Sequence, residues 1–202
     1  GTLINSVATY QNATSCFGSS SQLLTYVPDD NFETYLEANG MGDGIALNDY
    51  VTTANINTVT FLNVNNQNIS DLTGIEDFSA LTYLDCQNNW LTNLNVSQNT
   101  ALTYLDCWDN DLTFLDVSNN TSLDTLDCGT NQLSSLDVTQ NPSLIFLRCF
   151  INQITSLDVS HNLLLNVLRC SANQLTVLDV SQNTALTWLA CDGNGLSSLN
   201  LN

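Results

Sequence analysis

Apolar residues recur at fixed intervals along most of this chain, with polar residues between them. From residue 81 the frame LxxLxCxxNxL returns every 21 residues, and a looser copy precedes it from residue 59. Six of the seven cysteines hold the last apolar strand position of the frame: Cys86, Cys107, Cys128, Cys149, Cys170 and Cys191. Because one coil of this length cannot bury its own leucines, the period predicts a solenoid whose stacked coils share one apolar column.

The second half of each repeat reads LxVSxN, as in the stretch from Leu115 to Asn120. Its alternation of apolar and polar residues predicts a second short extended segment. No repeat contains a run of helix formers long enough for a stable helix. We therefore expect flat coils, with a strand on one side and strand-like or irregular chain on the other. The asparagine that ends the first strand is expected to satisfy backbone groups where the coil turns inward.

The frame with its cysteine position resembles the leucine-rich-repeat signature. Over about residues 59–202 the chain resembles bacterial surface leucine-rich-repeat proteins with a cysteine ladder, of the internalin type. The segment YVPDDNFETYLEANGMGDG resembles the N-terminal lead-in of repeat proteins of flavobacterium-like cell surfaces. The resemblance implies a right-handed leucine-rich-repeat solenoid with a parallel strand face, a place in the secreted or cell-surface class, and a role in adhesion.

The repeat divides the chain into two parts, because it is absent before residue 59. Residues 1–58 are expected to form an N-terminal segment and helical cap, and residues 59–202 a solenoid of about seven coils. The last coil is incomplete, so we expect the natural protein to continue. A helix is predicted at residues 28–40, opened by Pro28 and two acidic residues and closed by Gly40. It would cover the open end of the solenoid, which otherwise exposes leucines and a strand edge. The first 25 residues, with Cys16, have no assigned place.

The charge balance narrows the choice of partners. The chain has 20 acidic residues against two arginines and a formal net charge of −18. Such a surface repels phosphate backbones and anionic lipid, which argues against nucleic acid and against electrostatic docking on membranes. No apolar run approaches the roughly 20 residues that a membrane-spanning helix needs. We therefore expect a soluble chain without membrane insertion.

Neither a cofactor nor a metal is expected. Cysteines at equal positions of successive coils lie parallel, which disfavours both disulfides and a tetrahedral zinc site, so six reduced, buried thiols are predicted. The segment GMGDGIALNDY fits a calcium loop poorly, because only Asp43 and Asp49 supply carboxylates. His161 is the single histidine, and its position in the repeat predicts a turn residue. With no nucleophile placed beside a base, the sequence predicts a protein that is not an enzyme.

The outward positions of the strands form columns in which function can lie. Both arginines of the chain share one column on adjacent coils, next to aromatic residues. Exposed apolar patches mark interaction sites, and Trp, Tyr and Arg are enriched at binding hot spots. The candidate partner-binding residues are Tyr83, Tyr104, Trp108, Phe146, Arg148, Phe150, Ile151, Arg169 and Trp188. Ile145 belongs to the same apolar coil and is also expected to face solvent.

Other interpretations of these residues remain open. Arg148 could simply neutralise Asp127, and a flanking domain or a second copy could cover the apolar coil. A column of acidic residues on the opposite side, which includes Asp116 and Asp158, is expected to accept hydrogen bonds from turn amides rather than to bind cations.

The leading hypothesis is a non-catalytic recognition or adhesion module that binds a protein partner on a concave strand face. The alternatives are a carbohydrate-binding module for an acidic or sulfated glycan, and a passive spacer in a larger adhesin.

Overall fold

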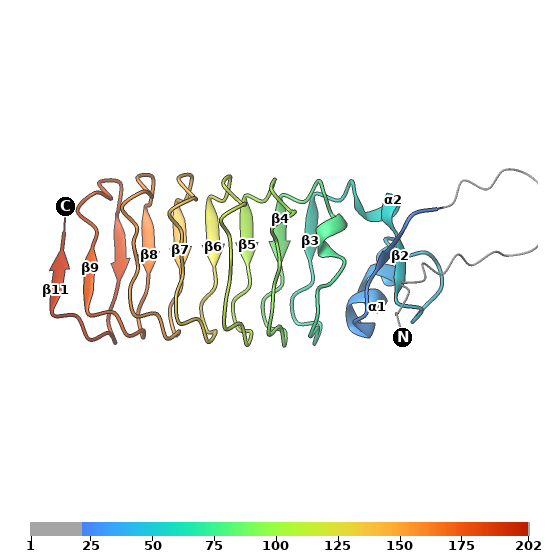
Figure 1. Ribbon diagram of the computed structural model, residues 1–202, viewed down its shortest axis with the longest axis horizontal. Helices are drawn as coiled ribbons and strands as arrows, with labels where there is room; N and C mark the ends of the chain where they lie inside the picture. The colour runs from blue at the N-terminus through green and yellow to red at the C-terminus, as the bar shows by residue number, and fades with distance from the viewer. Residues whose placement is uncertain (1–21, 202) are drawn as a thin grey trace, which may run out of the picture.

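A computed structural model describes residues 22–201 of the chain. The N-terminal part consists of β1 (Leu24–Tyr26), α1 (Asp30–Ala38), β2 (Tyr50–Thr52) and α2 (Thr53–Ile56). Strands β1 and β2 pair antiparallel. The rest is a solenoid whose coils follow one another along one line in Figure 1, with the cap elements at its N-terminal end. Cys16 and most of the segment without an assigned place lie outside the described residues.

Seven strands of three residues form one parallel sheet along the solenoid, in the order β10-β8-β7-β6-β5-β4-β3. Neighbouring strands pair in register, so that Tyr83 lies beside Tyr104 and Leu84 beside Leu105. A 3-10 turn, η1 (Ile75–Asp77), separates the first two strands. The predicted parallel strand face is therefore confirmed. Its strands are β3 (Phe61–Asn63), β4 (Tyr83–Asp85), β5 (Tyr104–Asp106), β6 (Thr125–Asp127), β7 (Phe146–Arg148), β8 (Val167–Arg169) and β10 (Trp188–Ala190).

The second extended segment forms strands only toward the C-terminal end. There β9 (Val177–Asp179) pairs in parallel with β11 (Ser198–Asn200), and an isolated parallel bridge joins Asn95 to Asp116. The other coils are irregular on this side. On the strand side, by contrast, paired neighbours follow one another at about 4.8 Å.

The inward positions form a continuous apolar core. The leucines of the frame are almost fully buried, as is every ladder cysteine from Cys86 to Cys170, and Cys191 is half-buried. All six are free thiols, as predicted, with Cys191 less covered than expected. Burial is the main cause that raises the pKa of Cys128 far above its ordinary value. Each buried leucine contributes roughly 1.5–3 kcal/mol relative to an exposed one, which makes this column the main source of stability.

Two ladders of asparagines join each coil to its neighbours. On the strand side, Asn110 donates from Nδ2 to the carbonyl oxygens of Cys86 and Cys107, both at 3.1 Å, and accepts the amide of Leu91 at 3.0 Å. On the opposite side, Asn120 donates to the carbonyls of the coil before it, at 2.9–3.0 Å. The first ladder was predicted from the frame, whereas the second had no role assigned. Both satisfy backbone groups that burial would otherwise leave unpaired.

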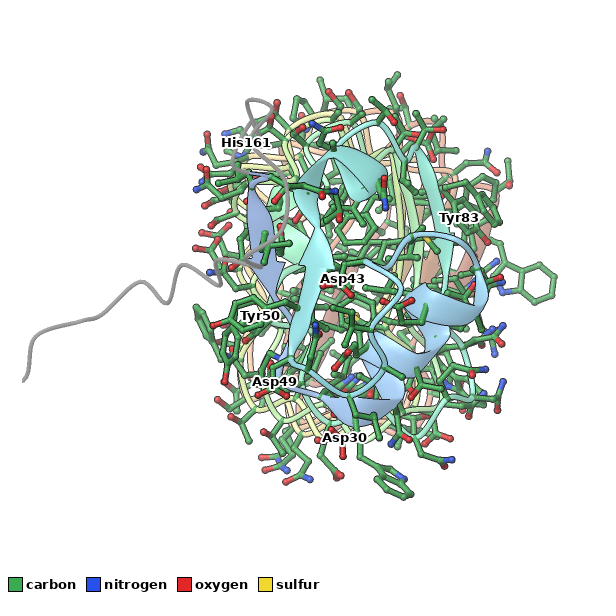
Figure 2. The ribbon with its side chains drawn as sticks, turned by 90° about the vertical axis from the view of Figure 1, so that its right-hand side faces the viewer. Asp30, Asp43, Asp49, Tyr50, Tyr83 and His161 are labelled. Atoms are coloured by element: carbon green, nitrogen blue, oxygen red, sulfur yellow. The ribbon has the colours of Figure 1, made fainter. Side chains whose placement is uncertain are left out.

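The cap is attached to the first coil through the carboxylate of Asp29. Asp29 caps α1 by accepting the amides of Asn31 and Phe32 on Oδ1, both at 3.0 Å. Its Oδ2 accepts the amide and the hydroxyl of Ser70, both at 2.8 Å. Because Asp29 has extended backbone angles, α1 begins at Asp30, inside the predicted range of 28–40. Figure 2 looks along the solenoid from this end and shows the cap elements lying across it.

The loop that follows α1 is also organised by side chains of that helix. Glu33 is fully buried and accepts the amides of Asn48 and Asp49, both at 2.9 Å. Glu37 accepts the amide of Asp43 at 2.7 Å. These hydrogen bonds give the segment from Gly40 to Tyr50 its shape. Two glutamates on one face of a short helix are the signal in the sequence that could have predicted this arrangement.

Candidate functional site

The first outward column of the strand face is aromatic at both ends. Phe61 and Tyr83 stack with ring centroids 4.4 Å apart, and Tyr83 and Tyr104 stack at 4.2 Å with an interplanar angle of 8°. At the far end, Phe146 is 36% and Trp188 62% exposed. The predicted residues of this column therefore lie on one surface. Phe61 was missed because it belongs to the looser first copy of the frame, but its spacing to Tyr83 could have revealed it.

The second column changes charge halfway along the sheet. Asp85, Asp106 and Asp127 are at most 7% exposed and lie on adjacent strands. Each accepts the amide of the residue two positions later on Oδ1. The second oxygen accepts from side chains: Asn65 and Gln87 at Asp85, Tyr104 at Asp106, and Arg148 at Asp127. Desolvation by burial, with the charges of the two flanking carboxylates, raises the pKa of Asp106 to about 6, although the amide of Trp108 opposes the shift.

Arg148 and Arg169 continue this column, and the structure gives them different contacts. The Nη1 of Arg148 lies 3.4 Å from Oδ2 of Asp127, so the predicted neutralisation is present. The guanidinium of Arg169 lies 4.9 Å from the ring centroid of Phe150, within the range of a cation–π contact. Among residues 22–201, the Arg148 pair is the salt bridge that the structure contains. Arg169 therefore presents an exposed charge backed by an aromatic ring.

The third column explains why Phe150 is half-buried rather than free in solvent. Its ring lies over Gly129 on the preceding coil, where an added Cβ would come within 2.6 Å of the ring. Trp108 contacts the residue next to Gly129, because its Nε1 donates to Oγ1 of Thr130 at 3.0 Å. Both residues were expected to face solvent, and Ile145 was too, but all three are partly covered. Phe146 and Ile151 are the truly exposed apolar residues of the predicted coil.

Ile151 stands where the backbone turns with a left-handed conformation. On other coils the same position is held by Asn88, Asp109 and Gly193, which adopt this conformation readily, and by Thr130 and Ala172, which do not. Ile151 has φ 51° and is 51% exposed. A β-branched residue is a genuine outlier in this region, and it costs of order 1–3 kcal/mol. The backbone of this coil is therefore strained at a residue whose side chain faces solvent.

The acidic column on the opposite side is structural. Asp116 and Asp158 accept the amides of Ser118 and Ser160, each at 2.9 Å. These hydrogen bonds lower the pKa of both carboxyls. The same bond recurs at the other two acidic members, Asp137 and Asp179. The predicted role in turn formation is confirmed.

His161 lies far from the strand face. Figure 2 places it on a different side of the solenoid from Tyr83. It is exposed, and its Nδ1 lies 3.2 Å from the hydroxyl of Ser160, as expected of a turn residue. In the part of the chain that the structure describes, no three His, Cys, Asp or Glu side chains could hold a metal ion together. No helix of that part is long and apolar enough to cross a membrane.

Comparison with known proteins agrees with this geometry. The functional domain of InlJ from Listeria monocytogenes, which includes a cysteine ladder, superposes with a TM-score of 0.69 at 37% identity. That likeness covers 90% of this chain and 48% of the solved one. The chain is an internalin J-like leucine-rich-repeat protein with a cysteine ladder. Internalin J of L. monocytogenes serotype 4b is also 40% identical over 83 residues, which are 41% of this chain and 9% of internalin J.

Other matches of this internalin J-like chain are more limited. A leucine-rich-repeat protein of Leptospira interrogans superposes with a TM-score of 0.58 at 27% identity, covering 66% of this chain and 40% of that one. A family model described as the LVIVD repeat matches residues 93–126, a short part of a period that continues on both sides. The chain spans about half the length of the solved internalin J domain and under a tenth of the whole protein.

Proposed function

We propose that this internalin J-like domain is a non-catalytic recognition module that binds a protein partner on its strand face. The proposed contact surface, the aromatic–arginine patch, lies on the coils of β7, β8 and β10. Tyr83, Tyr104 and Trp108 extend it toward the cap. The similarity to internalin J supports a place on the bacterial surface or outside the cell, and a role in adhesion. The patch consists of Phe146, Arg148, Phe150, Ile151, Arg169 and Trp188.

The strained position of Ile151 is the observation that carries the proposal. Stacking of the coils does not require isoleucine there, because other coils place Asn88, Asp109, Ala172 or Gly193 at the equivalent position. Thr130 is also β-branched, but it is partly covered and its hydroxyl accepts a hydrogen bond from Trp108. Isoleucine also exposes apolar surface to water. Strained residues persist where their side chain serves a purpose other than stability, and binding sites are where they cluster. A partner that covers Ile151 would explain both the strain and the exposure.

The neighbours of Ile151 have the composition of a binding hot spot. Trp188 and Phe146 are exposed, and Arg169 holds its charge over the ring of Phe150. Tryptophan and arginine are enriched among residues that dominate binding energy, because they combine large apolar area with a directed polar group. Arg148 contributes less, since Asp127 already neutralises part of its charge.

A carbohydrate ligand is the second candidate, and Arg169 is the observation that favours it. Its exposed guanidinium could bind a sulfate or carboxylate group while Trp188 stacks on a sugar ring. A protein partner explains more of the surface, because Ile151 and Phe146 offer aliphatic and aromatic area beyond one sugar-binding position. A passive spacer explains none of these features.

The replacement Ile151→Asn tests the proposal by separating stability from binding. Asparagine adopts the left-handed conformation readily, so unfolding in urea should show a gain of about 1 kcal/mol. Partner binding should weaken at least tenfold. Immobilised wild type, the Ile151→Asn variant and a triple variant (Phe146→Ala, Phe150→Ala, Arg169→Ala) would be incubated with surface-protein extracts and on an array of sulfated and acidic glycans.

Phe114→Ala is the matched control, because Phe114 is an exposed aromatic residue, 63% accessible, outside the three outward columns. It should capture the same partner as the wild type. A protein that the wild type and the control retain and that the triple variant loses would support the proposal. Equal capture by all variants would support the spacer, and binding confined to glycans would support the carbohydrate module.

A further inference from the structure

The charges on the strand face reverse about the middle strand of the sheet. Going from β4 to β8, the second outward column reads Asp85, Asp106, Asp127, Arg148, Arg169. These include both basic residues of the whole chain. Strand β6 is the middle of the seven strands. The face therefore has an acidic half on one side of β6 and a basic half on the other.

The large apolar residues are distributed evenly about the same strand. On one side of β6, β5 carries Tyr104 and its row continues to Trp108; on the other side, β7 carries Phe146 and its row continues to Phe150. The outermost strands carry Phe61 and Trp188, which are both well exposed. Between them, the row of β6 has only small or recessed outward residues. The two halves thus carry aromatic residues at matching positions, except that Tyr83 on β4 corresponds to Val167 on β8, and they are opposite in charge.

A surface of this kind is complementary to itself. A twofold axis that is parallel to β6 and lies between the two faces places a second copy face to face with the first. The rotation keeps the direction of the strands, so the outward columns of the two copies stay aligned. It reverses the order of the strands along the solenoid. Asp106 then faces Arg148 of the second copy, and Asp85 faces Arg169 of the second copy. Each contact occurs twice, as in every isologous dimer.

We propose that the strand face binds the same face of a second copy of this chain. The inference rests on the proposed function, and it names the partner as the domain itself. It also gives a role to the acidic half of the face, which the aromatic–arginine patch leaves unused. Asp127 lies on the axis, where Arg148 already neutralises it.

The size of the face predicts a weak contact. Seven strands at about 4.8 Å spacing extend about 29 Å, and three outward residues along a strand extend about 14 Å. The footprint of several hundred Å² is smaller than the roughly 800 Å² per partner of a standard interface. The net charge of −18 on each copy also opposes approach, although about 0.15 M salt screens charges beyond roughly 8 Å. Many weak contacts between two covered cell surfaces would still add up to firm attachment.

Charge reversal tests this contact directly. Sedimentation equilibrium at 0.15 M salt, up to about 1 mM protein, should show reversible dimers of the wild type. Asp106→Arg and Arg148→Asp should each weaken dimerisation at least tenfold, because every attraction that they replace with a repulsion occurs twice. An equimolar mixture of the two variants should recover the wild-type affinity. In a mixed dimer, the arginine introduced at position 106 faces the aspartate introduced at position 148, and the native Arg148 of one variant faces the native Asp106 of the other.

A second pair protects the test against misfolding. An arginine fits this column, as Arg148 and Arg169 show, so Asp85→Arg and Arg169→Asp should behave in the same way. Circular dichroism and thermal unfolding would verify that each variant folds. A wild type that stays monomeric throughout, or folded variants whose mixture stays monomeric, would overturn the proposal. In that case, capture of another protein through the aromatic–arginine patch would still support the proposed function.

Discussion

Asp106 is predicted to lower the stability of the native protein at neutral pH. The side chain is 7% exposed and lies between two other carboxylates, Asp85 and Asp127. Burial, followed by these charges, raises its pKa from 3.8 to about 6. Replacing Asp106 with Asn removes the charge and keeps an oxygen that can accept the amide of Trp108, which the carboxylate accepts at 3.0 Å. We therefore expect Asp106→Asn to stabilise the protein above pH 6.

The magnitude follows from linkage between protonation and folding. A folded-state pKa above the unfolded value means that the native state holds the proton more tightly. The resulting stability is fully present below pH 3.8 and is lost as the pH rises through about 6. A difference of about two pKa units at 1.36 kcal/mol each corresponds to about 3 kcal/mol. The variant should exceed the wild type by about that amount at pH 8 and by almost nothing at pH 3.5.

Urea unfolding of both proteins at pH 3.5, 5, 6.5 and 8 would measure the difference, in which the titration of all other groups cancels. Asp116→Asn is the matched control, because hydrogen bonds from Ser118 lower the pKa of that exposed carboxyl. It should therefore change stability in the opposite direction at pH 8. A constant difference across the pH range, or a wild type that is more stable than Asp106→Asn at pH 8, would refute the reasoning.

Three further changes test the ladders and the cap. Asn131→Ala should lower the free energy of unfolding by about 3 kcal/mol, because it leaves four buried backbone contacts unmade; a loss below about 1 kcal/mol in urea would count against this. Asp29→Ala should lower the melting temperature of the protein more at pH 7 than at pH 3, because the hydrogen bonds to Asp29 outweigh burial and lower its pKa. Equal decreases in melting temperature at the two pH values would contradict this. Iodoacetamide at pH 8 should alkylate Cys191 well before the enclosed Cys128, as peptide mapping by mass spectrometry can show.

Periodicity alone was sufficient to predict the solenoid, because a strict 21-residue step leaves little choice of register. Once Leu84 and Leu105 are equivalent, parallel stacking also places Tyr83 beside Tyr104. The free thiols followed from the same equivalence. The predicted strand-face columns are therefore the columns of the structure, and the pairing of Arg148 with Asp127 was among the interpretations that the sequence allowed.

Contacts between different columns could not be predicted in this way. Phe150 is half-buried because Gly129 leaves room for its ring, which requires the geometry of both coils. The cation–π contact of Arg169 depends on that placement. The strain at Ile151 is invisible in the frame until the left-handed turn is known. The loop after α1 depends on Glu33, whose hydrogen bonds reach 15 and 16 residues along the chain.

The in-register pairing of successive strands has a consequence for how such proteins vary in length. Gain or loss of a 21-residue unit would move everything beyond it by about half a nanometre, the distance between two paired strands. Every retained coil would keep its own inward and outward positions. The number of units can therefore set how far the domain extends, while the residues that face outward set what it binds.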